Sequence, residues 1–404
     1  MRRGSGALAA GIGASLWLIA AGSAAAMCGD GIADEGETRA TCPRDALVEK
    51  VEILVKGGTH GNVSPTTGEI VYDLHAGGGV WAMEIMDADG SNRRRLAGGG
   101  EVNAGWGAFS PDGSYIVYQK ETLPHYGDKD PRVKRLGMTG YGMFQDLWAI
   151  APDGKTDVRL TDLPIKMTEG DGIVAMAQVN PIFSRDGKRL FWTRRVDNSP
   201  PGNWGIWDVY TAEIVREGDT IRLESQRSLI HPPDICKGCI YANAMGMFPG
   251  DKKLLVIGNF EGQDVHYMDI YVYDLETAQL ENLTNTPERW EEGSCISPDG
   301  MSVVFMSDVD SKFKNDPKIE WQRQPTTKEW YLLDMESRDV KPLTYFNVPG
   351  SPDYEIGKGK RVFTGACSFA PDAKSLVGIV TIDYADPNSP TTRNETNLGR
   401  VVFR

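Results

Sequence analysis

The chain has 404 residues, of which 56 are acidic and 43 are basic, and its formal net charge is −13 at pH 7. This balance argues against nucleic acid and anionic membrane surfaces as partners, because both repel an acidic protein. An acidic face that binds cations or basic proteins is compatible with it.

The first residues have the pattern of a secretory signal peptide. Arg2 and Arg3 precede an uncharged run over 7–22, which ends at the small residues Ala24-Ala25-Ala26. We expect 1–26 to be cleaved and the protein to be periplasmic or secreted. No later segment approaches the roughly 20 apolar residues needed to span a bilayer, so we expect no stable membrane insertion after cleavage.

A short cysteine-containing segment, 27–46, comes next. Cys28 and Cys42 enclose a stretch too polar and glycine-rich to hold itself together, which predicts a disulfide between them. The segment resembles short Cys-Gly-Asp-Gly modules near the start of secreted bacterial proteins. Its carboxylates could supply oxygen ligands for calcium, although their spacing does not fit an EF-hand. These carboxylates are Asp30, Asp34, Glu35 and Glu37.

From residue 47 onward, a tight turn recurs before a short apolar strand. The turn reads Ser-Pro-Asp-Gly or a close variant, and such a turn joins a short strand to a hydrophobic one. Its copies lie at 67–68, 110–113, 184–187, 249–251, 297–300 and 370–373. They mark six units, each with the length of a four-stranded propeller blade with or without an inserted loop.

The second half of each unit also repeats, as a strand, a polar turn and a strand ending in Leu-Thr or its remnant. These segments lie at 81–96, 147–161, 271–284 and 330–344. The last unit stops after its third strand, 399–403, whereas an unassigned strand-like segment, 47–55, precedes the first unit. We therefore predict an all-β fold over 47–404: a six-bladed β-propeller of four-stranded blades, with the last blade closed by the N-terminal strand.

These repeats resemble the propeller repeats of TolB, the periplasmic translocation protein. Similar WD-like repeats occur in the propellers of prolyl oligopeptidases and dipeptidyl peptidases. The resemblance covers about residues 47–404 and implies a TolB-like propeller. It implies little about function, because the motif residues build turns and pack blades together.

The inserted loops are expected to gather on one face. In a propeller, the loops joining strands one to two and three to four share one face, and the remaining loops share the other. The long loops lie near 121–144, 194–204, 229–241, 308–329 and 383–397. We expect this long-loop face to carry a binding site, because long loops on a rigid scaffold commonly do. Solvated insertions are the alternative.

The segments just before each first strand should bring an acidic, amide-rich rim with two indoles to the channel mouth. This rim comprises Glu101, Asn103, Trp106, Asn180, Asn243, Trp290, Glu291 and Glu292. It could bind a cation, a sugar or a peptide amine. The alternative is a set of polar residues that hydrate the channel entrance.

The other four cysteines lie within the propeller. Cys236 and Cys239 form a lone C-x-x-C, for which we favour a local disulfide over free redox-active thiols or a metal site with His231. Cys295 and Cys367 lie in innermost strands of neighbouring blades, one residue out of register. Because adjacent positions point to opposite faces of a strand, we expect buried free thiols there.

Four of the five histidines fall in loops of the long-loop face: His75, His125, His231 and His266. Some propeller polysaccharide lyases resemble this chain in their repeats and use a histidine-held divalent metal. Scattered surface histidines are the alternative. No serine-hydrolase elbow, phosphate loop or dinucleotide fingerprint is present.

The sequence therefore favours an exported, non-enzymatic propeller scaffold that binds a protein, peptide or glycan on its long-loop face. The alternative is a metal-assisted polysaccharide lyase or hydrolase that uses the four histidines. No cofactor is firmly indicated, and calcium or another divalent cation is the candidate.

Overall fold

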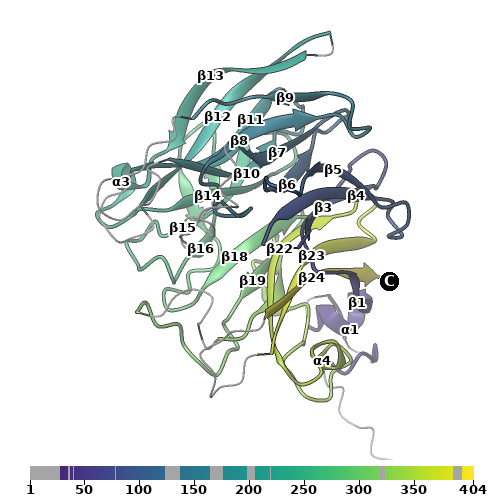
Figure 1. Ribbon diagram of the computed structural model, residues 1–404. Coiled ribbons are helices and arrows are strands. Elements are labelled where there is room, and N and C mark those ends of the chain that lie inside the picture. The colour runs from purple at the N-terminus through teal and green to yellow at the C-terminus, as the bar shows by residue number, and fades with distance from the viewer. Residues whose placement is uncertain are drawn as a thin grey trace, which may run out of the picture.

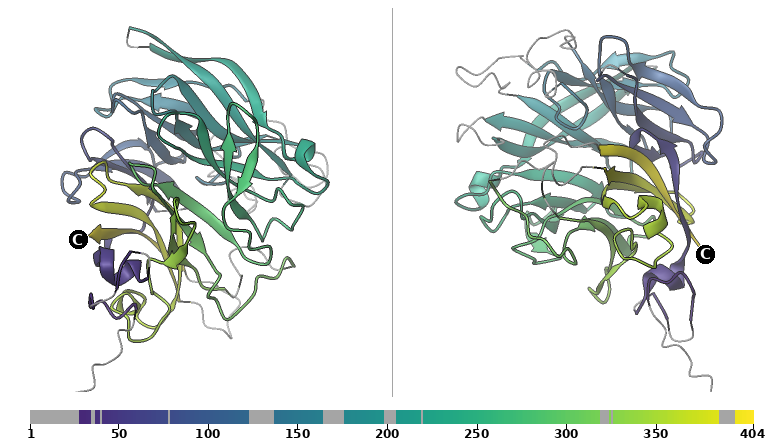
Figure 2. Two further views of the ribbon diagram at one scale, coloured as in Figure 1. Left: turned by 180° about the vertical axis from the view of Figure 1, so that it is seen from behind. Right: turned by 60° about the horizontal axis from the view of Figure 1, so that its bottom comes forward.

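The computed structural model describes residues 28–404, apart from 35–36, 40, 78, 123–136, 164–175, 198–204, 219, 319–323, 325 and 385–393. In this part of the chain, six four-stranded antiparallel sheets form a ring (Figures 1 and 2). The predicted all-β, six-bladed propeller is confirmed. The described residues include no helix that is long and apolar enough to cross a membrane.

The first three blades follow one another along the chain. Blade one comprises β2 (Gly58–Val63), β3 (Ile70–His75), β4 (Trp81–Met86) and β5 (Arg94–Gly98). Blade two comprises β6 (Ala104–Phe109), β7 (Ile116–Glu121), β8 (Gln145–Ile150) and β9 (Asp157–Arg159). Blade three comprises β10 (Ala177–Phe183), β11 (Arg189–Asp197), β12 (Ile206–Glu217) and β13 (Thr220–Ile230).

The other three blades complete the ring, with short helices between some elements. Blade four comprises β14 (Ala242–Met247), β15 (Lys253–Gly258), β16 (Asp269–Asp274) and β17 (Leu280–Asn282). Blade five comprises β18 (Glu291–Ile296), β19 (Ser302–Ser307), β20 (Glu329–Asp334) and β21 (Val340–Pro342). Blade six comprises β22 (Arg361–Phe369), β23 (Ser375–Asp383), β24 (Asn394–Phe403) and β1 (Val48–Lys56). The helices among the described residues are α1 (Pro43–Leu47), α3 (Pro232–Ile235) and α4 (Tyr354–Gly357).

The ring is closed by the N-terminal strand, as the sequence predicts. β1 pairs with β24 in antiparallel register, with Val51 opposite Val401, and the two strands lie beside the C-terminus in Figure 1. Val48 and Val55 are fully buried or nearly so. The closure therefore buries apolar side chains as well as covering the open edge of β24.

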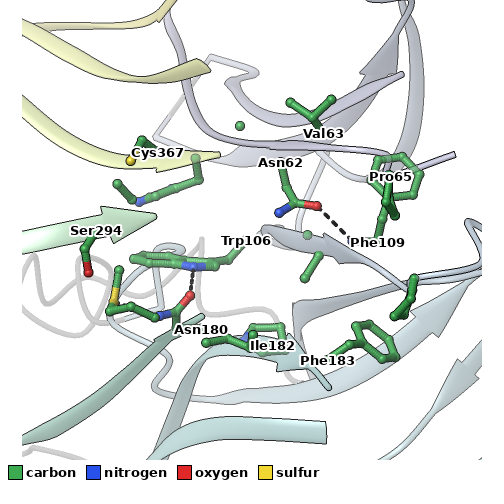
Figure 3. Close-up of a pocket in the computed structure, with 18 of the residues that line it drawn as sticks. Asn62, Val63, Pro65, Trp106, Phe109, Asn180, Ile182, Phe183, Ser294 and Cys367 are labelled. Atoms are coloured by element: carbon green, nitrogen blue, oxygen red, sulfur yellow. Dashed lines mark hydrogen bonds between the residues drawn. The ribbon is translucent and has the colours of Figure 1, made fainter. Parts of the chain in front are cut away.

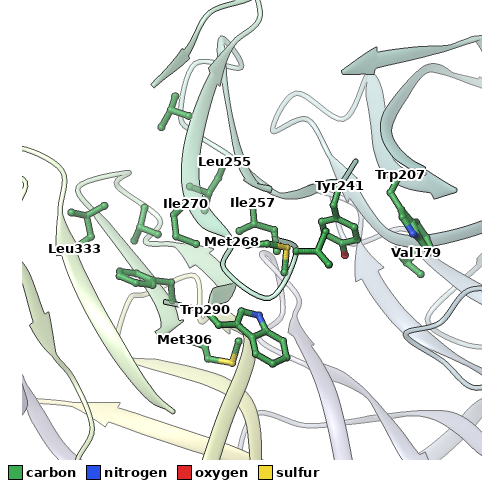
Figure 4. Close-up of a cluster of buried hydrophobic side chains, with 14 of the residues drawn as sticks. Val179, Trp207, Tyr241, Leu255, Ile257, Met268, Ile270, Trp290, Met306 and Leu333 are labelled. Atoms are coloured by element: carbon green, nitrogen blue, oxygen red, sulfur yellow. The ribbon is translucent and has the colours of Figure 1, made fainter. Parts of the chain in front are cut away.

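Apolar side chains of neighbouring blades interdigitate to form the core. The largest cluster spans blades three to five and centres on bulky residues from their inner strands (Figure 4). It includes Tyr241, Ile257, Ile270, Trp290 and Met306, each at most 8% exposed. This packing makes the blades a rigid support for the residues around the axis.

All three cysteine pairs of the described chain are disulfides. Cys28–Cys42 and Cys236–Cys239 are bonded as predicted. Cys295 and Cys367 are also bonded, with Cα atoms 5.5 Å apart, so the prediction of free thiols is wrong. Each blade turns one face to the next blade and its opposite face to the previous one. Cys295 and Cys367 therefore meet between blades five and six, although they point to opposite faces of their own strands.

Most loops are distributed as expected, but parts of the predicted loops 194–204 and 383–397 belong to β11 and β24, and one hairpin is an exception. The turns between first and second strands are short throughout, whereas the connections 122–144, 231–241, 308–328 and 343–360 are long and leave from the other face. The exception is the β12–β13 hairpin, which projects beyond its neighbours on the tight-turn face (Figure 1). Arg216 of this hairpin forms an ion pair of 2.6 Å with Asp112, in the turn of blade two.

Candidate binding site at the central channel

Each innermost strand contains a one-residue bulge at a similar height along the channel. Three bulges carry side chains with positive φ, namely His60 at 45°, Trp106 at 53° and Asn180 at 55°. A bulky residue in this region is strained, and such strain tends to persist where a site requires it. The bulges aim these side chains at the axis.

Asp73 holds two of these side chains in place. Its carboxylate lies 2.9 Å from Nδ1 of His60 and accepts the backbone N–H of Trp106 at 2.8 Å. Asp73 is fully buried, and burial raises the pKa of its carboxyl although the bond to His60 opposes this. A Cβ at Gly105 would lie 2.4 Å from the Asp73 carboxyl carbon, so only glycine fits beside it.

Aromatic and amide groups continue this network across the channel. The His60 and Trp106 rings stack with centroids 3.8 Å apart. Trp106 donates from Nε1 to the Asn180 oxygen at 2.8 Å (Figure 3). Asn180 in turn donates to the Asn243 oxygen at 3.0 Å. Gly140, from the connection between β7 and β8, packs against the Trp106 ring, where a Cβ would approach within 2.8 Å.

Two cavities lie along the axis and share His60, Trp106, Met245 and Ala366. The shared residues therefore line the section between the cavities. The larger cavity, about 440 Å³, lies toward the tight-turn face and is lined by the ends of the innermost strands, including Val63, Phe109 and Phe183 (Figure 3). The smaller, about 260 Å³, lies toward the long-loop face.

The smaller cavity, called here the channel cavity, is lined by opposite charges within aromatic walls. Lys328 is 5% exposed, and its Nζ lies 3.1 Å from the centroid of the Trp290 ring. Burial lowers the pKa of Lys328 to about 7. Glu292 accepts the Trp290 Nε1–H at 3.0 Å, and burial raises the pKa of its carboxyl while the Lys328 charge opposes this. Phe363 and Trp106 complete the walls.

Five of the eight residues expected at the channel mouth lie at the axis: Trp106, Asn180, Asn243, Trp290 and Glu292. The other three do not line either cavity. Glu101 is exposed in the turn between blades one and two. Asn103 is buried, where it accepts the Trp81 backbone N–H and donates to Glu121. Glu291 is buried within blade five and accepts the Ser307 hydroxyl at 3.2 Å.

The structure does not bring the described histidines of the long-loop face together as a metal site. His231 and His266 each contact a separate carboxylate, Asp208 at 2.7 Å and Asp264 at 2.6 Å. His75 ends β3 and packs edge-on against Trp81. His125 lies outside the described residues.

The only described group of three metal-ligating side chains is Cys28, Cys42 and Asp45, and its two cysteines are joined to each other. Asp30, Asp34 and Glu37 form no such group among the described residues, and Glu35 lies outside them. Cys236 and Cys239 are likewise joined as a disulfide. Calcium at the N-terminal segment therefore stays a prediction.

Several residues of the site were not predicted, and His60 and Lys328 show why. The distance along the sequence from His60 to the turn that follows it agrees, to within one residue, with the corresponding distances for Trp106 and Asn180. Alignment of the repeats could therefore have found His60. Lys328 ends a long loop whose path no repeat specifies. Its position depends on how that loop returns to the axis.

These features define a six-bladed propeller with an axial site of aromatic, amide and charged groups. No family model matches the sequence, and no curated protein matches it. Similar solved structures belong to the TolB-like class of six-bladed propellers. TolB from Acinetobacter baumannii is 13% identical, with a TM-score of 0.44, and the match covers 88% of this chain and 64% of that one.

Two further structures show the range of this similarity. A putative TolB from Agrobacterium tumefaciens is 15% identical with a TM-score of 0.46, and the match covers 71% of this chain and 80% of that one. An oligogalacturonate lyase in complex with manganese is 11% identical with a TM-score of 0.45, and the match covers 88% of this chain and 93% of that one. The present chain spans less than two thirds of the A. baumannii protein.

Proposed function

We propose that this protein is an exported, non-enzymatic propeller scaffold that binds a protein, peptide or glycan at the channel cavity and the long-loop face around it. One observation carries the proposal. Lys328 and Glu292 lie buried or partly buried in a cavity walled by aromatic rings. A mainly apolar cavity with a few convergent polar groups of shifted pKa is the usual character of a ligand site.

Export is part of the proposal. The three disulfides suit an oxidising compartment such as the periplasm or the cell exterior. We assign 1–26 as the signal peptide, 27–46 as a short N-terminal segment and 47–404 as the propeller domain.

A binding scaffold is favoured over a metal-assisted lyase or hydrolase for a geometric reason. The alternative depends on histidines that converge on one metal. His231 and His266 are instead each engaged by a different carboxylate, as described above. The charged groups that do converge are those of the channel cavity.

The test is a comparison of three purified proteins on peptide and glycan arrays. Lys328→Met removes the buried charge at similar length, and Lys188→Met removes an 81% exposed charge on the tight-turn face. We expect ligands bound by the unmodified protein to lose at least tenfold in affinity with Lys328→Met and to be unaffected by Lys188→Met. Equal binding by all three proteins contradicts the proposed site, and cleavage of a bound glycan contradicts the non-enzymatic assignment.

A further inference from the structure

We infer that the channel cavity binds a small zwitterion, a molecule with one ammonium and one carboxylate group, as in a free amino acid or a short peptide. The inference rests on the proposed function and names the chemistry of the ligand. It is carried by two opposite charges, Lys328 and Glu292, that line one cavity and form no direct ion pair with each other.

Lys328 provides the half of the site that recognises a carboxylate. Within the described part of the chain, its ammonium has no carboxylate within 4.0 Å and forms no hydrogen bond, and its side chain is almost completely buried. The nearby Asp308 already accepts the Trp290 backbone N–H at 2.9 Å and the Asn315 amide. A buried ammonium without a direct ion pair or hydrogen bond is costly, and a ligand carboxylate would supply that charge-assisted bond.

Glu292 provides the half that recognises an ammonium. One of its carboxylate oxygens accepts the Trp290 indole N–H, and among the described residues the other accepts no hydrogen bond. Trp106 and Phe363 line the same cavity and offer ring faces. A carboxylate beside aromatic faces is a favourable environment for a cationic amine.

The pairing of charges excludes simpler ions. A lone anion would meet the Glu292 carboxylate, and a lone cation would meet the Lys328 ammonium, so each gains from one group and is repelled by the other. A zwitterion in the matching orientation satisfies both. The volume of about 260 Å³ is below the roughly 300–1,000 Å³ typical of sites for drug-sized ligands, which suits a ligand of one or two residues.

The test is isothermal titration of the purified protein with the standard L-amino acids and with dialanine. Each ligand that binds is then titrated in four forms: free, N-acetylated, C-amidated, and blocked at both ends. We expect at least one free form to bind, each singly blocked form to bind at least tenfold more weakly, and the doubly blocked form to show no heat of binding. This series needs no variant, so it does not depend on the folding of one.

Two variants assign the halves of the site. Lys328→Met should abolish the difference between the free and C-amidated forms, and Glu292→Gln should abolish the difference between the free and N-acetylated forms. Lys188→Met is the control and should bind as the unmodified protein does. Absence of binding by every free form, or equal binding of the doubly blocked form, overturns the inference. If array ligands still depend on Lys328 in that case, the proposed function stands and only the zwitterion assignment fails.

Discussion

At the scale of single residues, the axis of the propeller combines backbone strain with buried charge. Trp106 adopts a φ of 53° and is held there by its backbone bond to Asp73 and its indole bond to Asn180. A residue held in such a conformation costs on the order of 1–3 kcal/mol, which the surrounding contacts must offset. Part of the backbone strain thus lies beside the channel cavity, where we place ligand binding.

The buried carboxyl of Glu291 should make stability depend on pH. Burial raises its pKa to about 8, and hydrogen bonds from Thr284, Thr286 and Ser307 only partly oppose this. Between about pH 4.5 and 8 the folded state therefore keeps a proton that the unfolded state loses. Stability should fall as pH rises through this window, by up to ~1.4 kcal/mol per pH unit from this group.

Glu291→Gln should flatten this dependence, because a neutral amide holds no titrating proton. The measurement is urea unfolding of both proteins at pH 5.5, 6.5 and 7.5 (about one-unit steps across the window). The difference between the two proteins isolates Glu291 from other titrating groups. Glu281→Gln, at a side chain that is 52% exposed, is the control and should keep the original slope. An unchanged slope in Glu291→Gln would contradict the assignment.

At the scale of elements, blades five and six are joined covalently at their innermost strands. The bond between Cys295 of β18 and Cys367 of β22 connects blades five and six across 72 residues of sequence. A disulfide that closes a long loop restricts the unfolded chain strongly and typically stabilises by about 2–4 kcal/mol. This bond therefore stabilises the blade interface next to the ring closure.

Replacing both cysteines, Cys295→Ala with Cys367→Ala, should lower the free energy of unfolding by about 2–4 kcal/mol. The control pair, Cys236→Ala with Cys239→Ala, spans only 3 residues and should cost less. Urea unfolding of both double variants gives the comparison, and peptide mapping without reduction identifies the bonded pairs. Recovery of unmodified Cys295 and Cys367 thiols from native protein would refute the pairing.

At the scale of the whole molecule, the ring depends on its N-terminal strand more than on the segment before it. β1 completes blade six, whereas in the segment before it Cys28 contacts Tyr345, in the connection after blade five, and Arg39 contacts Ser302 of blade five. Between them, Arg44 is 2% exposed and forms a two-pronged bond with Asp353, at 2.9 and 2.7 Å. This buried ion pair links α1 to the connection before β22.

Two truncations should separate these contributions. Deletion of 47–55 removes nearly all of β1 and should abolish the cooperative unfolding of the ring, because β24 loses its outer partner and apolar surface becomes exposed. Deletion of 28–42 keeps both β1 and the Arg44–Asp353 pair, so the ring should stay folded with a modest fall in Tm. Differential scanning calorimetry of both proteins is the measurement. An unchanged Tm after deletion of 47–55 would be incompatible with the closure.

The sequence predicted the propeller because its information is local and repeated. Each Asp-Gly turn fixes the connection of two strands, and six copies fix the number of blades. The hairpin of β12 and β13 was missed because its extra length is specific to blade three. The pairing of Cys295 with Cys367 was missed because alternation along a strand does not show that opposite faces of two neighbouring blades meet.

The candidate site was predicted only in part for a related reason. Residues at repeated positions, such as Trp106 and Asn180, could be placed at the axis from the repeat alone. Glu291 and Glu292 are neighbours in sequence, yet Glu291 packs within blade five while Glu292 lines the channel cavity. Alternation along a strand separates them, and which of the two faces the channel depends on the bulge that follows.

The sequence by itself determined the number of blades, the closure by β1 and the face that carries the long loops, because turn chemistry and apolar alternation act over a few residues. Only the tertiary structure decided which charges meet at the axis. Lys328 comes from the loop before β20 and Glu292 from the bulged strand β18 of the same blade, and the ring places residues of other blades, such as Trp106 and Phe363, around them to form the cavity.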